Sequence, residues 1–125
     1  MKKNIISDKA PKPIGPYSQA VEFRDLIFTS GQIALDTKGN IVSDEIDEQT
    51  KQALDNIKSI LDDNGSSMDN VIKTTVFLKD MIYFNSMNEV YETYFSKSLP
   101  ARSTVAVLGL PKNVKVEIEV IAFKN

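Results

Sequence analysis

Pro100-Ala-Arg-Ser-Thr-Val-Ala-Val107 and Val114-Lys-Val-Glu-Ile-Glu-Val-Ile-Ala-Phe123 are the two most strand-like stretches of this sequence. In both, β-branched residues alternate with polar ones, which is typical of a strand with two different faces. Pro100 has no backbone N–H to donate and therefore suits the start of a strand. Between the two stretches, Leu108-Gly-Leu-Pro-Lys-Asn113 supplies turn residues, so the chain is expected to pass there from one strand to the next.

Two opposite charges lie on these predicted strands. Arg102 is at the start of the first strand, and Glu117 is inside the second. Because side chains alternate along a strand, Glu117 shares a face with Glu119, Ile121 and Phe123. An arginine and a carboxylate on neighbouring strands could form a small polar site, or an ordinary surface ion pair of little energetic value. The local pattern alone favours the ion pair, because such pairs are common.

The composition is that of one globular domain, residues 1–125. Of the 125 residues, 42% are hydrophobic and 26% are charged, which provides for an apolar core. No apolar run approaches the length of a membrane span, and the Met1-Lys-Lys start lacks the apolar segment of a secretion signal. No cysteine is present, so no disulfide framework is expected. The expected location is the cytoplasm.

Histidine and cysteine are both absent, which excludes many catalytic arrangements. Nucleophile systems and zinc sites built on these residues cannot occur. Catalysis would have to use carboxylates, lysine, tyrosine, hydroxyls, arginine, backbone groups or bound water. The five glycines form no nucleotide-binding loop. With a net charge of −2 and a pI of about 5.1, a general attraction to nucleic acid is not expected.

The N-terminal segment predicts a short strand at Ile5-Ile6 followed by a stiff loop. Three prolines and one glycine within residues 11–16 restrict the backbone of that loop, which delivers Tyr17 to the next strand. Tyr17 could line a pocket, although a hydrophobic plug with a solvent-facing hydroxyl is the better local interpretation.

A hairpin is predicted next. Ala20–Phe23 and Leu26–Ser30 are its strands, and a tight turn joins them. Gly31 interrupts the second strand, which is expected to continue through Gln32–Leu35. The glycine permits either a plain bulge or the close approach of a ligand to the backbone.

Two amphipathic helices are predicted. The first begins near Ser43-Asp44 and ends at Asn64-Gly65, where a left-handed residue can follow the last turn. Its apolar stripe contains Ile46, Thr50, Ala53, Leu54, Ile57, Ile60 and Leu61. Asp80 is the expected cap of the second helix. The apolar face of that helix contains Phe84, Met87, Tyr91, Tyr94 and Phe95. Asn88 lies at the edge of this face, where its amide could enter a pocket or remain a half-exposed boundary residue.

The predicted element order indicates an α+β domain with a mixed sheet and both helices on one face. The strand Val71–Leu78 has two half-apolar faces, one with Ile72, Thr74, Val76 and Leu78 and the other with Val71, Lys73, Thr75 and Phe77. Helices on one face leave the other uncovered. That face is expected to be buried against copies of the same chain, which predicts an oligomer.

Six motifs together resemble those of the RidA/YjgF family of reactive-intermediate deaminases. They are Ile14-Gly-Pro-Tyr-Ser-Gln19, Thr29-Ser-Gly-Gln32, Leu54-Asp-Asn-Ile57, Lys73-Thr-Thr-Val-Phe77, Pro100-Ala-Arg-Ser103 and Val116-Glu-Ile-Glu119. The resemblance implies a chorismate-mutase-like fold and a homotrimer with three sites in the clefts between subunits. It also implies hydrolysis of 2-enamino or 2-imino acids to 2-keto acids and ammonia, and hence the removal of reactive metabolites.

The resemblance also implies roles for individual residues. Arg102 corresponds to the arginine that holds the substrate carboxylate, and Glu117 to the glutamate that holds the hydrolytic water. The residues implied to line the pocket are Tyr17, Ser30, Gly31, Asn88 and Thr104, the last at a position where some members have cysteine. No metal or organic cofactor is implied. The expected substrates are 2-aminoacrylate, 2-iminopropanoate and 2-iminobutanoate, which PLP-dependent dehydratases release.

Two alternative functions belong to other classes of protein. One is a ligand-sensing regulator or chaperone-like protein that uses the same pocket without turnover, since such roles have been assigned to family members. The other is a ribonuclease, an activity also attributed to some members. The acidic pI and the lack of histidine argue against the ribonuclease, because phosphate contacts normally need clustered lysine or arginine.

Overall fold

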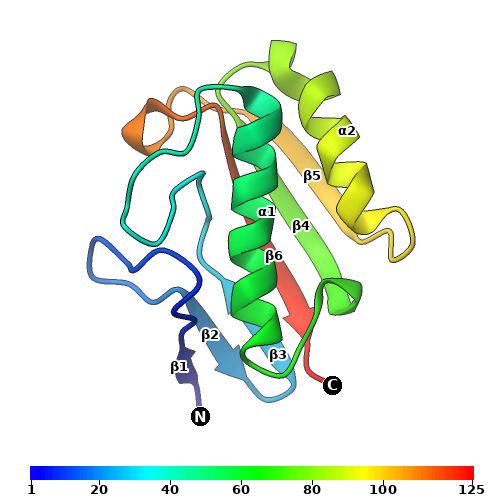
Figure 1. Ribbon diagram of the computed structural model, residues 1–125. Coiled ribbons are helices and arrows are strands. Elements are labelled where there is room, and N and C mark those ends of the chain that lie inside the picture. Colours follow the sequence, from blue (N-terminus) through cyan, green and yellow to red (C-terminus); the bar gives the residue numbers. More distant parts are fainter.

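A six-stranded sheet with two helices over one face makes up the computed structural model, which describes residues Met1–Asn125 (Figure 1). Both predicted helices and the α+β class are confirmed. The strands are β1 (Lys3–Ile5), β2 (Ala20–Phe23), β3 (Leu26–Thr29), β4 (Val71–Leu78), β5 (Ala101–Ala106) and β6 (Val116–Phe123). The helices are α1 (Ile46–Asp62) and α2 (Phe84–Phe95), with 3₁₀ turns at Met68–Asn70, Met81–Tyr83 and Pro111–Asn113.

The order of strands in the sheet is β1-β2-β3-β6-β4-β5, and this corrects one expectation. The two stretches around Arg102 and Glu117 are β5 and β6, but β4 lies between them. β4 pairs with β6 in the antiparallel sense and with β5 in the parallel sense. A parallel pair needs a crossover connection, and α2 supplies it between β4 and β5. The turn residues 108–113 therefore join two strands that are not neighbours.

The helices begin and end close to the predicted residues, for local reasons. α1 begins at Ile46 rather than at Ser43, because the backbone of Glu45 is still extended and the Ser43 hydroxyl accepts the Glu45 N–H at 3.0 Å in a separate turn. Asp80 accepts the N–H of Ile82 at 2.9 Å and caps the 3₁₀ turn that runs directly into α2.

Three strand predictions differ from the structure. The first strand is Lys3–Ile5 rather than Ile5-Ile6. Residues 32–35 form only two isolated bridges, Gln32 with Ile118 and Leu35 with Ile41, in place of a continued strand. At the start of β4 a bulge shifts the register, so that Val71 is buried and Ile72 is exposed, opposite to the strict alternation expected.

The core lies between the helices and one face of the sheet. The stripe predicted on α1 is buried there except for Ile46, which is half-buried, together with Met87, Tyr91 and Phe95 of α2. On β6 the residues facing the helices are Val116, Ile118, Val120 and Ala122, all 2% exposed or less. No helix combines the length and the apolar composition needed to cross a bilayer.

The opposite face of the sheet carries no helix and is strongly apolar. Phe28 is 40% exposed, Phe123 43% and Val105 45%, and Phe77 and Ile121 are partly exposed beside them. The pairing register places Phe28 opposite Ile121 and Phe77 opposite Val105, so these side chains lie on one continuous surface. We call this surface the open face.

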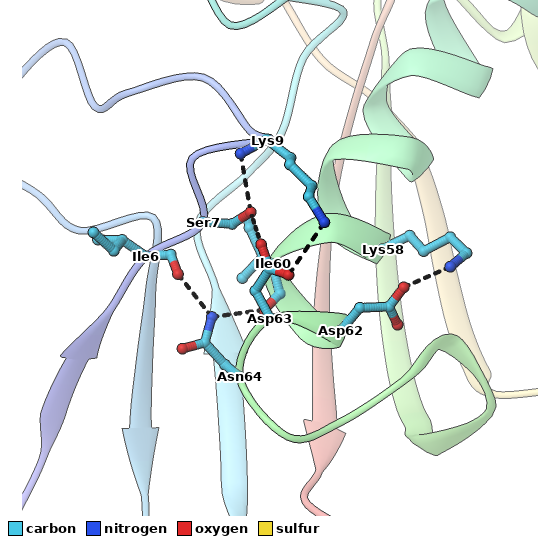
Figure 2. A network of polar contacts seen from close by, with 8 residues as sticks. All are labelled: Ile6, Ser7, Lys9, Lys58, Ile60, Asp62, Asp63 and Asn64. Carbon is cyan, nitrogen blue, oxygen red and sulfur yellow. Dashed lines mark hydrogen bonds and ion pairs between the residues drawn. The ribbon is translucent and has the colours of Figure 1, made fainter.

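A polar network ties the N-terminal segment to the end of α1 (Figure 2). The Ser7 hydroxyl donates to Asp63 Oδ2 at 2.6 Å and accepts the Lys9 N–H at 3.1 Å, and Lys9 Nζ lies 3.6 Å from Asp63 Oδ1. Asn64 Nδ2 donates to the carbonyls of Ile6 and Ile60. These contacts hold the chain where it enters the proline-rich loop.

The hydrogen bond from Ser7 is the main cause that lowers the pKa of the Asp63 carboxyl, with the Lys9 charge a smaller one and desolvation opposing both. A carboxyl whose pKa is lower in the folded state stabilises the fold above its unfolded pKa, and this contribution disappears as the pH falls through the folded pKa. We therefore expect Ser7→Ala to lower Tm by roughly 2–5 °C at pH 7, and by less below the carboxyl range.

The matched control is Asp62→Asn, which removes the exposed pair between Lys58 and Asp62 beside the same network. Exposed pairs contribute little, so its Tm should change by no more than about 1–2 °C. Thermal melts of the three proteins between pH 3 and 7 test this. A loss in Ser7→Ala that is independent of pH would contradict the role given to Asp63.

Candidate active site

Arg102 occupies the second position of the edge strand β5, on the face toward α2. Its guanidinium donates to Asn88 Oδ1 at 2.7 Å and lies 4.6 Å from the centroid of the Tyr91 ring. None of the four ion pairs in the structure includes Arg102. A guanidinium carries five N–H donors, so most of them remain free for an anion. A hollow of 460 Å³ opens beside it, lined also by Phe95 and Leu99.

Thr104 lies two residues further along β5, on the same face as Arg102. Its register partner on β4 is Val76, which is fully buried. The Thr104 hydroxyl is buried and has no hydrogen-bond partner within the chain. An unpaired buried hydroxyl is unfavourable, and Thr104 is not among the residues that line the hollow beside Arg102.

Glu117 lies on β6, on the open face. Gly31 is directly against it: a Cβ added to Gly31 would lie 1.9 Å from Glu117 Oε2. The backbone explains this closeness, because Gln32 and Ile118 exchange two hydrogen bonds of 2.7 and 3.0 Å and so hold residues 31 and 117 together. Only glycine leaves room for the carboxylate here, which accounts for the break in the predicted strand.

A cavity of 400 Å³ is lined by Glu117, Gly31, Ser30 and Tyr17, together with the proline-rich loop. The Ser30 hydroxyl donates to the Ser18 carbonyl at 2.6 Å. Tyr17 is 51% exposed and its hydroxyl accepts only a long contact of 3.4 Å, so it is a wall of this cavity rather than a buried plug. Four of the predicted site residues are thus brought together in one chain.

The Arg102 cluster and the Glu117 cluster do not meet within one chain. Arg102 pairs with Thr74, and Thr74 pairs with Val120, whereas Glu117 is three residues from Val120 along β6. An odd separation along a strand reverses the face, so Arg102 points toward the helices and Glu117 toward the open face. A site, or an ion pair, between the two residues on neighbouring strands is therefore excluded within one chain.

The electrostatic state of Glu117 is perturbed. Burial beside the proline-rich loop raises the pKa of its carboxyl, and the negative charge of Glu119 two residues away raises it further. A carboxyl with a raised pKa is a stronger base in its charged form than an ordinary carboxylate, so it is better suited to take a proton from water.

Two residues of these clusters were not predicted from the sequence. Tyr91 was assigned to the core only, although its position three residues after Asn88 on α2 brings both to the same edge of the helix. Gln19 is 3% exposed: its Oε1 accepts the Ser7 N–H at 2.7 Å, and its Nε2 donates to the Pro11 carbonyl at 2.9 Å. It thereby fixes the loop that walls the Glu117 cavity. A glutamine directly before a predicted strand gives no local signal of this.

The structure contains no cluster of three or more acidic side chains suited to hold a metal ion. A hollow of 680 Å³ between α1 and α2 is larger than the two described above, but its lining includes none of the predicted site residues. What the arrangement offers chemically is an anchored guanidinium for a carboxylate and, separately, a carboxylate with a raised pKa that can act on water.

The structure is thus a small α+β protein with an arginine that forms no ion pair beside one hollow and a glutamate in a separate cavity. A family model described as endoribonuclease L-PSP matches residues 7–124. The chain belongs to the RidA/YjgF family, as its sequence motifs indicated.

The relatives that align with the whole chain are named either as RutC family proteins or as 2-iminobutanoate/2-iminopropanoate deaminases. The chain is 54% identical over 126 residues to a RutC family protein of Pyrococcus horikoshii, covering 100% of both chains. It is 49% identical over 126 residues to the 2-iminobutanoate/2-iminopropanoate deaminase of Mus musculus, covering 100% of this chain and 93% of the mouse protein. The crystal structure of Escherichia coli TdcF with bound serine has a TM-score of 0.92 and 41% identity, covering 98% of this chain and 99% of that chain.

The raised pKa of Glu117 leads to a prediction that does not depend on the reaction. Glu119→Gln removes the neighbouring negative charge, so it should lower the pKa of Glu117 toward the ordinary carboxyl value. ¹³C NMR titration of the glutamate carboxyl groups measures this directly.

Glu89→Gln is the control, since Glu89 lies on α2 beside the hollow between the helices. It should leave the titration of Glu117 unchanged. The assignment of burial and Glu119 as causes is wrong if Glu117 titrates in the ordinary range, or if both variants shift it equally.

Proposed function

We propose that the protein is an enamine/imine deaminase that hydrolyses 2-imino acids, such as 2-iminopropanoate and 2-iminobutanoate, to 2-keto acids and ammonia. The observation that carries this proposal is the guanidinium of Arg102, which contacts Asn88 and Tyr91 and forms no ion pair. A planar guanidinium can bind a planar carboxylate through two parallel hydrogen bonds. Relatives with the deaminase name are 42–49% identical to this chain.

The proposed reaction needs little from the protein. A 2-enamino acid tautomerises to the imine, and a protonated imine is electrophilic enough for water to attack its carbon. As the C–O bond forms, Glu117 takes one proton from the water and then returns it to the nitrogen of the resulting carbinolamine. The C–N bond breaks, and the remaining hydroxyl proton passes through Glu117 to the departing ammonia, which leaves as ammonium. Arg102 orients the substrate carboxylate, and Glu117 holds the water and takes its proton. Gly31 supplies backbone groups close to the Glu117 carboxylate.

We further propose that each site is assembled from two subunits of a homotrimer with a chorismate-mutase-like arrangement. Two observations support an assembly. Arg102 and Glu117 point to opposite faces of one sheet, so one chain cannot place both on one substrate. The apolar open face, with Phe123 43% exposed, is suited to burial against another copy. In a cyclic trimer the same interface occurs three times. At each interface the Arg102 cluster of one subunit would lie beside the Glu117 cluster of its neighbour.

The other functional classes receive less support. The family model is described as an endoribonuclease, but the chain has no histidine and a net charge of −2, which suit neither phosphate binding nor histidine acid–base chemistry. Ligand sensing without turnover would use the same clusters. A dehydratase assay distinguishes the deaminase from the ligand sensor. The protein is mixed with a PLP-dependent serine or threonine dehydratase, and keto-acid release is followed. Faster release supports the deaminase, and ligand binding without faster release supports the sensor.

Arg102→Ala is the first variant that tests this function. Loss of a charge-assisted, two-point contact should cost about 2–4 kcal/mol of transition-state stabilisation, or roughly one and a half to three orders of magnitude in rate. Arg102→Lys should recover little, because an ammonium lacks the planar fork. Glu117→Gln should slow hydrolysis but leave 2-oxobutanoate binding largely intact. The assays are 2-iminobutanoate hydrolysis, calorimetric binding and Tm.

Arg24→Ala is the control, because it removes the only other arginine in the chain, at the β2–β3 turn. It should keep full activity. The carboxylate role of Arg102 is wrong if Arg102→Ala is fully active, or if it loses activity only because the assembly dissociates.

The assembly predicts a mass three times that of the 14.0 kDa chain at micromolar concentration. Phe123→Asp places a charge on the open face and should shift light scattering toward smaller species. Ile82→Asp is the matched control: Ile82 is 78% exposed in the 3₁₀ turn before α2, away from the open face, and the variant should keep the wild-type mass. A monomeric wild-type mass would contradict both the trimer and the shared site.

A further inference from the structure

The aromatic ring of Tyr91 packs against one side of the Arg102 guanidinium. The guanidinium carbon lies 4.6 Å from the centroid of the Tyr91 ring, and 5.6 Å from that of Phe84. A cation over an aromatic face is attracted by the ring quadrupole, and more strongly where water is excluded. Tyr91 is only 7% exposed, so this contact is largely shielded from solvent.

The Tyr91 ring is itself fixed at its other end. Its hydroxyl shares a hydrogen bond of 2.7 Å with Thr74 Oγ1, and Thr74 is fully buried on β4. Thr74 is the register partner of Arg102, so the strand that pairs with Arg102 also holds the ring that supports it. On the side, the Phe95 ring packs against Tyr91 with centroids 4.6 Å apart. Tyr91 therefore has little freedom to turn.

Two-point binding of a carboxylate requires that the guanidinium has one defined orientation. Asn88 Oδ1 fixes a single nitrogen of Arg102 at 2.7 Å, which by itself leaves rotation about that contact. The ring of Tyr91 blocks one side of the guanidinium and so restricts this rotation. Burial raises the pKa of the Tyr91 hydroxyl despite the opposing effect of Arg102, so the phenol stays neutral and does not compete for the arginine charge.

We propose that Tyr91, tethered by Thr74, is a positioning residue that orients the Arg102 guanidinium for the substrate carboxylate. This inference rests on the proposed function for its consequence in catalysis, but the orientation itself can be measured without any substrate. Tyr91 does not touch the reacting atoms and acts through Arg102.

The first measurement is of the free protein. ¹⁵N NMR of arginine side chains at low temperature separates the Nη signals of a guanidinium whose rotation is restricted. Arg102 should give separate signals in the wild type and averaged signals in Tyr91→Leu, whereas Tyr91→Phe, which keeps the ring, should retain partial separation. Tyr94→Leu is the matched control. It removes another aromatic ring of α2, together with the hydrogen bond of that ring to Asp55, and should leave the Arg102 signals unchanged.

The second measurement is the affinity for 2-oxobutanoate, a carboxylate that does not react further. Tyr91→Leu should raise its Kd by roughly 2- to 12-fold, because binding must then order a guanidinium side chain that the ring no longer holds. Tyr91→Phe should raise it less. Starting from Arg102→Lys, the same Tyr91→Leu change should have an effect of less than about twofold, because an ammonium has no plane to orient.

Stability is separated from positioning by a paired variant. Tyr91→Phe leaves the Thr74 hydroxyl buried without a partner, whereas Tyr91→Phe with Thr74→Val removes both polar groups and should recover Tm. The Kd should stay raised in the paired variant if the tether matters for orientation; a Kd that recovers together with Tm would overturn the proposal.

The remaining outcomes are also distinct. Equal Arg102 signals in the wild type and Tyr91→Leu would overturn the positioning role. A wild type that neither binds 2-oxobutanoate nor hydrolyses 2-iminobutanoate would refute the proposed function, while a collapse of the Arg102 signals in Tyr91→Leu would still support the positioning role.

Discussion

The alternation of side chains along a β-strand is the constraint on which the arrangement of this site depends. Arg102 is in register with Thr74 and Val120, on the face covered by the helices, and Glu117 is an odd number of residues away on the other face. The same alternation makes one face of β6 the core and gives the other its two glutamates beside Ile121 and Phe123. One sheet thus separates the proposed carboxylate anchor from the proposed base, so the proposed site needs a second chain to bring them together.

Each charged group is supported by a different kind of structure. Arg102 is held by side chains, the amide of Asn88 and the ring of Tyr91, which both come from α2. Glu117 is held by backbone: the bonds between residues 32 and 118 press it against Gly31, and the proline-rich loop desolvates it. The two clusters are thus positioned by different elements, a helix edge for Arg102 and a loop with backbone hydrogen bonds for Glu117.

Much of the fold could be predicted from local patterns. Val71–Leu78 and Ala20–Phe23 have the predicted bounds, the stripe of α1 is buried except for Ile46, and Glu117 lies on the predicted face. Strand pairing could not be predicted, because insertion of β4 between β5 and β6 depends on a crossover through α2 rather than on the turn at residues 108–113. Of the candidate site, Tyr17, Ser30, Gly31 and Glu117 lie around one cavity, whereas Asn88, which was predicted to line the same pocket, lies with Arg102 beside α2. The support by Tyr91 was missed, since an aromatic residue in an apolar stripe has the same pattern whether or not a cation lies over it.

The most direct test of a shared site is complementation between two inactive proteins, Arg102→Ala and Glu117→Gln. Each is expected to lack one half of every site. After the two are unfolded, mixed in equal amounts and refolded, random trimers should contain sites that take Arg102 from one chain and Glu117 from its neighbour, with activity of roughly a quarter of the wild-type value. Each variant refolded alone should stay inactive. If the mixture also stays inactive although mixed trimers form, Arg102 and Glu117 do not act together across a subunit interface.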